Sequence, residues 1–322
     1  MALGSTDKSQ SISLSHEERR EGKYSPETLA KVLGALHQDG LVVLKDVIPV
    51  ETIDQFNTWM CADAERRISD PKQTYNFGIK SNILQRPPVT QPELLSKDVY
   101  FNPFVLQTAN AYLGHPPVWN WLTANTALAN TTTARQPPHK DLVHDHPLYP
   151  HYFIANIPLC DFTIHNGATE FWLGSHAHTT QADQVVAQTQ EDIAPYQEAS
   201  EIGSVIPPIT AEAVGERRRV RPPVQPECSR GDVVIRDLRL WHAGMPNHSD
   251  KHRVMLALGY MSPHYPNSFL KVHLPSSQQK FFLENAARSG VEMRAQWYNT
   301  EDLAATTEDT NFRTAPDWLE KA

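Results

Sequence analysis

The sequence contains little cysteine, and its cysteines lie far apart. Its 322 residues include only Cys61, Cys160 and Cys228, none of them in a CxxC spacing. An odd number of distant cysteines argues against a disulfide framework and against a cysteine-based zinc site. We therefore expect reduced thiols, as in proteins of the cytoplasm.

The sequence also lacks an excess of positive charge, a long apolar run and a glycine-rich phosphate loop. Lysine and arginine number 29 against 37 aspartate and glutamate residues, which gives a formal net charge of -8. This balance argues against nucleic acid and against anionic membrane surfaces as partners. No stretch is long enough for a membrane helix, and no N-terminal apolar run predicts a signal peptide. A cytoplasmic location is therefore the expectation.

Apolar residues make up 40% of the chain, which is enough for a sizeable core. Residues 1 to 22 are polar and are predicted to form a flexible tail, while residues 23 to 322 are expected to form one domain. Apolar spacing predicts helices over 25 to 40, 51 to 67 and 102 to 113, and a strand over 41 to 48. For the first helix, Ser25 is a suitable N-cap, Pro26 suits the first turn and Gly40 ends the pattern.

From about residue 117 to 263 the sequence changes to short β-branched or aromatic runs between turns, which is typical of a β sandwich or barrel. A polar insert from about 180 to 228 is too long for a hairpin loop and is interpreted as a lid or a disordered segment. Within it the basic run ERRRVRPP, 216 to 223, is interpreted as a solvated loop, with contact to an anionic substrate as the alternative. Residues from about 265 to 322 are predicted to be a helical tail, with one helix ending at Gly290.

Histidine and aspartate are concentrated in QPPHKDLVHDH, residues 136 to 146. On an extended strand, side chains two apart point to the same side, so His139 and Asp141 would face one spot. Two ligands rarely complete a catalytic metal site. The segment RGDVVIRDLRLWHAG offers a third ligand, His242, just after a predicted strand. The other histidines of the 136 to 146 stretch are more often structural than ligands.

Arg253 stands eleven residues after His242, at the start of the apolar strand RVMLALGYM. A charge in such a strand needs an anionic partner, and a carboxylate ligand matches the fork of the guanidinium. Two neutral imidazoles and one carboxylate leave three positions open on an octahedral ion, as in non-haem Fe(II) oxygenases. A 2-oxo acid would take two of these positions and place its far carboxylate on Arg253, and O2 would take the last. The expected reaction is oxidation of an unactivated C–H bond in a small molecule held nearby.

Three blocks of the sequence resemble the phytanoyl-CoA dioxygenase family of Fe(II)/2-oxoglutarate oxygenases. QPPHKD resembles the family's Q-x-x-H-x-D, DFTIHNGATEFWLGSHAHT its turn-and-strand block, and RGDVVIRDLRLWHAGMPNHSDKHRVMLALGY its distal G-D…H…R block. The likeness covers most of residues 25 to 265, and the three blocks in this order are more specific than any one alone. The resemblance implies a mainly β fold with flanking helices, whose core is a double-stranded β-helix, also called a jelly roll or cupin-like core.

The resemblance also implies roles for single residues. The implied Fe(II) ligands are His139, Asp141 and His242, and the implied 2-oxoglutarate contacts are Arg253, Gln136 and Thr169. Asn82, in SNILQRPP, matches a loop that lines the substrate pocket in fungal biosynthetic members. Leu173 departs from the proline that is usual before Gly-Ser-His, which changes a turn and not the chemistry. Because Asp141 is present, a halide would find no vacant ligand position, and halogenation is not expected.

The residues leave the substrate and several alternatives open. The resemblance to fungal members favours oxidation of a natural-product intermediate, with release of succinate and CO2. An acyl-CoA hydroxylase of the same family would use basic residues such as those from Arg217 to Arg221 at the pocket mouth. A zinc-dependent hydrolase with the same three ligands, or a non-catalytic cupin-like binding protein, would not need Arg253. Hydroxylation, desaturation and related outcomes all stay open, and a homodimer is only a hypothesis.

Overall fold

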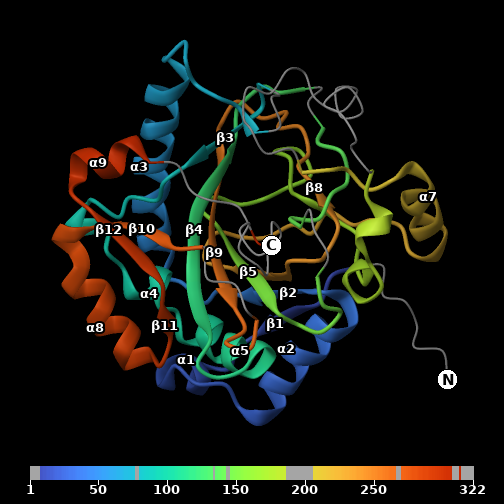
Figure 1. Ribbon diagram of the computed structural model, residues 1–322, viewed down its shortest axis with the longest axis horizontal. Helices are drawn as coiled ribbons and strands as arrows, with labels where there is room; N and C mark the ends of the chain where they lie inside the picture. Colours follow the sequence, from blue (N-terminus) through green and yellow to red (C-terminus); the bar gives the residue numbers. More distant parts are fainter. Residues whose placement is uncertain are drawn as a thin grey trace, which may run out of the picture.

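The computed structural model describes residues 8–76, 80–132, 135–142, 146–185, 206–265, 270–306 and 312. At its centre is an eight-stranded sheet in the order β1-β2-β7-β5-β9-β4-β11, with β3 also paired to β4 (Figure 1). Its strands are β1 (Ser11–Ser13), β2 (Leu41–Lys45), β3 (Asn82–Gln85), β4 (Val118–Ala127), β5 (Tyr152–Pro158), β7 (Val233–Asp237), β9 (Arg253–Met261) and β11 (Glu292–Met293). Strands from both ends of the described chain therefore join one sheet.

The long strands send alternate side chains to the two faces of this sheet. On β5, Phe153, Ala155 and Ile157 enter the main hydrophobic core, while Asn156 lines a pocket on the opposite face. The same alternation on β7 buries its isoleucine in the core and turns the neighbouring Arg236 to the pocket. Period-two patterning thus gives the sheet one apolar face, and a second face that carries both the polar residues of the pocket and apolar ones.

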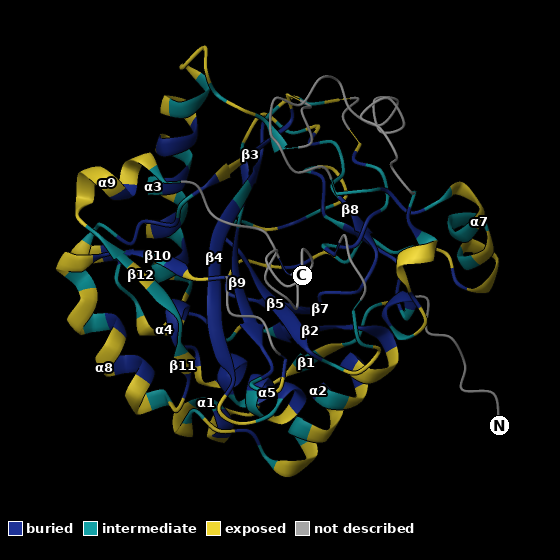
Figure 2. Cartoon of the chain, viewed as in Figure 1, coloured by how far each residue is buried: buried dark blue, intermediate teal, exposed yellow. Residues whose placement is uncertain are grey.

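Helices cover the apolar face, with buried inner sides and exposed outer sides (Figure 2). These helices are α2 (Pro26–Asp39), α3 (Val50–Ile68), α4 (Lys97–Tyr100), α5 (Pro103–Leu113) and α8 (Gln279–Ser289). The helices predicted over 25 to 40, 51 to 67 and 102 to 113 are confirmed as α2, α3 and α5. In α2, Ser25 Oγ accepts from the Thr28 N–H, and Gly40 ends the helix in the left-handed region. None of the helices in the described ranges combines the length and apolar character that crossing a bilayer requires.

Two smaller sheets complete the β structure. β6 (Glu170–Phe171) pairs with β8 (His242–Ala243), and β10 (Val272–Pro275) runs parallel to β12 (Ala295–Tyr298). The β6–β8 pair contributes Phe171 and His242 to the same pocket that the main sheet lines. The β core that was predicted from about 117 to 263 is thus present. Its pocket lies between the main sheet and the β6–β8 pair.

The N-terminal segment differs from the flexible tail predicted for residues 1 to 22. Within its described part, β1 pairs with β2, and α1 (His16–Glu21) follows. Ser15 Oγ accepts from the Glu18 N–H at 3.1 Å, and the Glu18 carboxylate accepts from the N–H groups of Ser15 and Ser25, both at 2.8 Å. The prediction was wrong for residues 11–21 because backbone pairing and helix capping order a segment that has few apolar residues.

The basic run at 216 to 223 is also not the solvated loop that was predicted. Most of it belongs to α7 (Ala211–Val220), at one edge of the molecule (Figure 1). Arg221 is buried and pairs with Asp39 at 2.6 Å, and Arg217 donates to the Leu173 carbonyl. Arg218 lies over the Trp172 ring, 5.0 Å from its centroid. Internal partners for these arginines explain why the run folds onto the protein.

The region after residue 265 was predicted to be helical, but the structure shows both helices and strands there. It contains α8, which ends at Gly290 as expected, and α9 (Thr300–Ala305), but also β10, β11 and β12. These strands are held by backbone hydrogen bonds: β10 pairs with β12, and β11 pairs with β4. Much of the predicted lid, residues 186 to 205, lies outside the described residues, as do 313 to 322, and the lid stays a prediction.

Candidate metal centre and its pocket

His139, Asp141 and His242 converge on one point. His139 and His242 form an isolated antiparallel bridge, with N–H···O distances of 2.9 and 2.8 Å and ring centroids 4.3 Å apart. Asp141 Oδ1 lies 3.8 Å from His139 Nε2 and 3.6 Å from His242 Nε2. One ligand atom from each residue lies within 4.8 Å of the other two. Two imidazoles and one carboxylate in this arrangement fit a divalent transition metal with open positions.

The backbone that carries the first two residues is not the extended strand that was predicted. His139 makes only the single bridge to His242, and Asp141 lies in a bend. The two side chains nevertheless face one spot, because the bridge fixes the imidazole while Arg236 holds the carboxylate. The predicted convergence therefore holds for a different local reason.

Each imidazole is oriented by a backbone carbonyl behind it. His139 Nδ1 lies 2.9 Å from the Pro137 oxygen, and His242 Nδ1 lies 3.1 Å from the Leu240 oxygen. A carbonyl oxygen only accepts, so Nδ1 carries the proton and the Nε2 lone pair is left for a metal. Burial lowers the pKa of both histidines, which favours the neutral form that binds metal.

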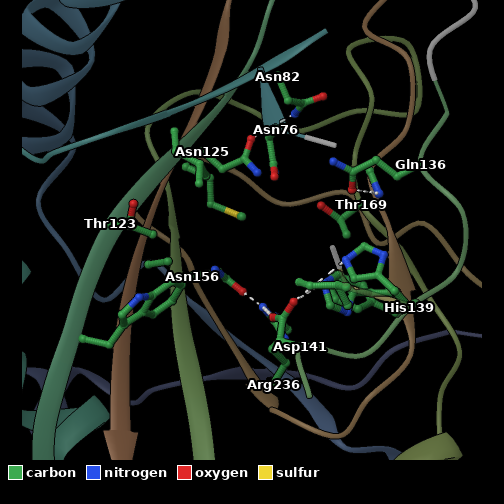
Figure 3. Close-up of a pocket in the computed structure, with 18 of the residues that line it drawn as sticks. Asn76, Asn82, Thr123, Asn125, Gln136, His139, Asp141, Asn156, Thr169 and Arg236 are labelled. Carbon is green, nitrogen blue, oxygen red and sulfur yellow. Dashed lines mark hydrogen bonds and ion pairs between the residues drawn. The ribbon is translucent and has the colours of Figure 1, made fainter. Parts of the chain in front are cut away.

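Asp141 is held by a buried cation. Arg236 Nη2 donates to Asp141 Oδ2 at 2.5 Å, and Arg236 Nε donates to Asn156 Oδ1 at 3.1 Å, a chain visible in Figure 3. Burial raises the pKa of Asp141, but the Arg236 guanidinium and the two imidazoles together outweigh this effect and hold the pKa below its usual range. The carboxylate is therefore ionised, with Oδ2 occupied by Arg236 and Oδ1 directed to the imidazoles.

Arg253 opens β9 on the wall of the same pocket. Its side chain is 3% exposed, and its Nε and Nη1 have no hydrogen-bond partner among the residues the structure describes. The guanidinium carbon lies 4.5 Å from the centroid of the Phe162 ring, and burial lowers the pKa of Arg253 to about 10. A buried cation without an anionic partner fits a site for a ligand carboxylate.

The other predicted contacts also line the pocket. Gln136 Oε1 accepts from the Gly244 N–H at 2.9 Å, and Thr169 lies beside it, near His139 (Figure 3). Asn82 lies at the opposite end, where its Nδ2 donates to Asn125 Oδ1 at 2.9 Å. Asn82 thus contributes to the wall, although this hydrogen bond engages part of its amide. The roles of all three in binding stay predictions.

Several pocket residues were not foreseen from the sequence. They are Trp121, Asn125, Asn156, Arg236 and Phe312. A signal existed for two of them: Arg236 stands in the buried strand VVIRD and Asn156 in the apolar run YFIANIP. The reasoning that identified Arg253, a polar group in an apolar strand, applies equally to both.

Comparisons with known proteins agree with this geometry. The family model described as phytanoyl-CoA dioxygenase (PhyH) matches residues 36–255. A curated relative, the iron/alpha-ketoglutarate-dependent dioxygenase ausO of Aspergillus calidoustus, is 25% identical over 242 residues, which covers 70% of each chain.

Solved structures establish the fold. The epimerase SnoN, in complex with Fe3+, alpha-ketoglutarate and nogalamycin RO, superposes with a TM-score of 0.53 at 17% identity, covering 74% of this chain and 85% of that one. AviO1 from Streptomyces viridochromogenes Tue57 gives 0.50 at 22% identity, covering 74% and 97%. These likenesses confirm the predicted mainly β, jelly-roll core with flanking helices. Because the family model spans more than half of the chain, the protein belongs to the phytanoyl-CoA dioxygenase family.

Proposed function

We propose that the protein is an Fe(II)- and 2-oxoglutarate-dependent dioxygenase that oxidises an unactivated C–H bond of a small natural-product intermediate. Its family makes it an oxidoreductase of the dioxygenase class. The observation that carries the proposal is that one pocket contains both the cluster of His139, Asp141 and His242 and the guanidinium of Arg253, whose Nε and Nη1 have no partner among the described residues. Iron would be bound by the cluster, and the C5 carboxylate of 2-oxoglutarate by Arg253.

The protein's own groups prepare this chemistry. When bound, Fe(II) with 2-oxoglutarate and O2 supplies an oxidant able to attack a C–H bond, with succinate and CO2 as coproducts. The carbonyls behind the imidazoles fix the neutral tautomer, and Arg236 keeps Asp141 ionised. Arg253 and Gln136 offer N–H donors to the cosubstrate, and the surrounding apolar side chains exclude water from the reaction.

Two observations support a natural-product substrate: the similar proteins, and the positions of the basic residues from Arg217 to Arg221. The SnoN complex with nogalamycin RO supports this class of substrate, and the ausO relative is a fungal dioxygenase, in line with the resemblance to fungal members. An acyl-CoA hydroxylase would place basic groups at the pocket mouth, but none of the arginines from Arg217 to Arg221 is among the described residues that line the pocket. A small natural-product substrate therefore fits the structure better than an acyl-CoA does.

Anaerobic spectroscopy separates the proposal from a zinc hydrolase and from a non-catalytic binding protein. Addition of 2-oxoglutarate to the Fe(II)-loaded protein should give a weak visible charge-transfer band, which the Zn(II)-loaded protein cannot give. His242→Ala should lose the band together with the metal, whereas His248→Ala, outside the cluster, should keep both. Absence of the band, with no 2-oxoglutarate binding by calorimetry, would refute the proposal.

A further inference from the structure

The pocket wall contains six buried nitrogen atoms that have no hydrogen-bond partner within the described part of the chain. They are Trp121 Nε1, Gln136 Nε2, Asn156 Nδ2, Arg236 Nη1, and Nε and Nη1 of Arg253. All six are N–H donors, and no buried oxygen of the residues known to line the pocket is left unpaired in this way. Among the fully buried side-chain atoms of the described lining residues, the unsatisfied groups are therefore donors and not acceptors.

The two amides in this set have an unambiguous orientation. Gln136 Oε1 faces the backbone N–H of Gly244 at 2.9 Å, and Asn156 Oδ1 faces the guanidinium Nε of Arg236 at 3.1 Å. Both partners can only donate, so each amide must present its oxygen to them. The NH2 groups of Gln136 and Asn156 are what remains for a ligand.

Unpaired donors select the ligand by its acceptors. A buried polar group without a partner costs about 1–3 kcal/mol, and this cost is recovered only by a molecule that brings oxygen acceptors. A cationic substrate would find no acceptor among these unpaired atoms and would leave them unsatisfied.

Under the proposed function, 2-oxoglutarate would satisfy Arg253 and Gln136, and Trp121 Nε1, Asn156 Nδ2 and Arg236 Nη1 would remain. Trp121 is 8% exposed on β4, and Asn156 is 2% exposed on β5. Trp121 meets Phe312, another pocket residue, edge to face with ring centroids 5.7 Å apart. This places a single N–H donor on an otherwise apolar part of the wall. Other apolar lining residues are Leu84, Phe171, Met255 and Ala257.

We propose that the substrate is an apolar, uncharged molecule that presents a carbonyl-type oxygen, as in a ketone, ester or lactone, to the Trp121 indole N–H. Asn156 Nδ2 and Arg236 Nη1 are the further donors of the wall. Trp121 is then a specificity-determining residue, which binds and orients the substrate without touching the metal. This inference rests on the proposed function, because it assigns the donors of Arg253 and Gln136 to 2-oxoglutarate.

The test uses two tricyclic probes that differ at one position: the lactone sclareolide and its cyclic ether ambroxide, in which a CH2 replaces the carbonyl. Binding is measured by ligand-observed NMR to the Zn(II)-loaded protein saturated with 2-oxoglutarate, with adamantylammonium as a cationic probe. We expect the lactone to bind about 5- to 10-fold more tightly than the ether, the value of one hydrogen bond, and the ammonium to show no binding. Trp121→Phe should bring the ratio close to one, and Trp297→Phe, on β12, should leave it unchanged.

Three results would overturn the inference: a wild-type ratio below about two-fold, including no lactone binding; a preference that survives in Trp121→Phe; or ammonium binding that matches the lactone. The wild-type ratio tests the inference even if Trp121→Phe folds poorly. Failure of the proposed function is distinguishable, because it would appear as absent 2-oxoglutarate binding before any probe is added.

Discussion

Replacement of Arg253 by methionine should change stability and cosubstrate binding in opposite directions. Burial lowers the pKa of Arg253 from 12.5 to about 10. One pKa unit corresponds to 1.36 kcal/mol, so keeping this group charged costs about 3 kcal/mol. The Phe162 ring, 4.5 Å away, offsets part of that cost. Without ligand, we therefore expect the free energy of unfolding to rise by about 1–3 kcal/mol in Arg253→Met.

Binding of 2-oxoglutarate should respond in the opposite sense. Loss of a buried, charge-assisted pair costs about 2–5 kcal/mol, which is a loss of affinity of at least thirtyfold. At a 2-oxoglutarate concentration of about 100 times its dissociation constant, the wild type should gain about 2.7 kcal/mol of stability. The variant should gain less than about 1 kcal/mol. Arg253→Lys, which keeps the charge but loses the paired donors, should fall between the two.

Urea denaturation of the Zn(II)-loaded protein, with and without 2-oxoglutarate, measures both effects, and calorimetry gives the affinities. A ligand-free Arg253→Met that is less stable than wild type by more than about 1 kcal/mol would refute the reasoning, because the guanidinium would then have a stabilising partner. Unchanged affinity for 2-oxoglutarate would remove Arg253 from the cosubstrate site.

Three further changes test the fold around the site, each by urea denaturation. Glu18→Gln should lower the free energy of unfolding by about 1–2 kcal/mol at pH 7, because it weakens the hydrogen bonds of the helix cap. Burial raises the pKa of Glu18, but the backbone N–H donors lower it to about 2. Because this folded pKa lies below the unfolded value of 4.5, the difference should be present above about pH 4.5 and vanish as the pH falls to about 2. Gly259→Ala should cost about 1–3 kcal/mol, since a Cβ there would lie 2.4 Å from Tyr152 Oη. Arg221→Ala should cost about 3–5 kcal/mol by leaving a buried aspartate unpaired, whereas exposed Arg218→Ala should cost less than about 1 kcal/mol.

The metal cluster could be predicted because histidine and aspartate are concentrated in residues 136 to 146 and the distal block supplies His242, and Arg253 because a charged group in an apolar strand is conspicuous in a sequence. The same signal marks Arg236, whose partner Asp141 lies 95 residues earlier. Sequence spacing shows that such a cation needs a partner but not which carboxylate folding brings to it. The N-terminal strand β1 could not be predicted for a different reason. Its side chains contribute little to the core, and the segment is held by backbone hydrogen bonds to β2, which leave no pattern in the residue types.

The position of Trp121 in the pocket could not be predicted from the alternation of side chains along a strand. Trp119 and Trp121 are two apart, so a regular strand would place them on one face. In the structure Trp119 packs in the helix-covered core and Trp121 lines the pocket. Their partners on β9, Tyr260 and Gly259, are consecutive, so Asn120 is an extra residue in β4, a bulge that reverses the alternation.

Two residues stabilise this bulge. The Tyr152 hydroxyl donates to Asn120 Oδ1 at 2.6 Å, and Gly259 leaves room for Tyr152 and Trp121, because a Cβ at 259 would lie 2.9 Å from Trp121 Cβ. An asparagine between two tryptophans and a glycine within an apolar strand are the traces of the bulge in the sequence. Each is ambiguous alone, and only strand pairing shows that they meet. The donor that we assign to substrate recognition therefore depends on an irregularity of the sheet, which no periodic pattern encodes.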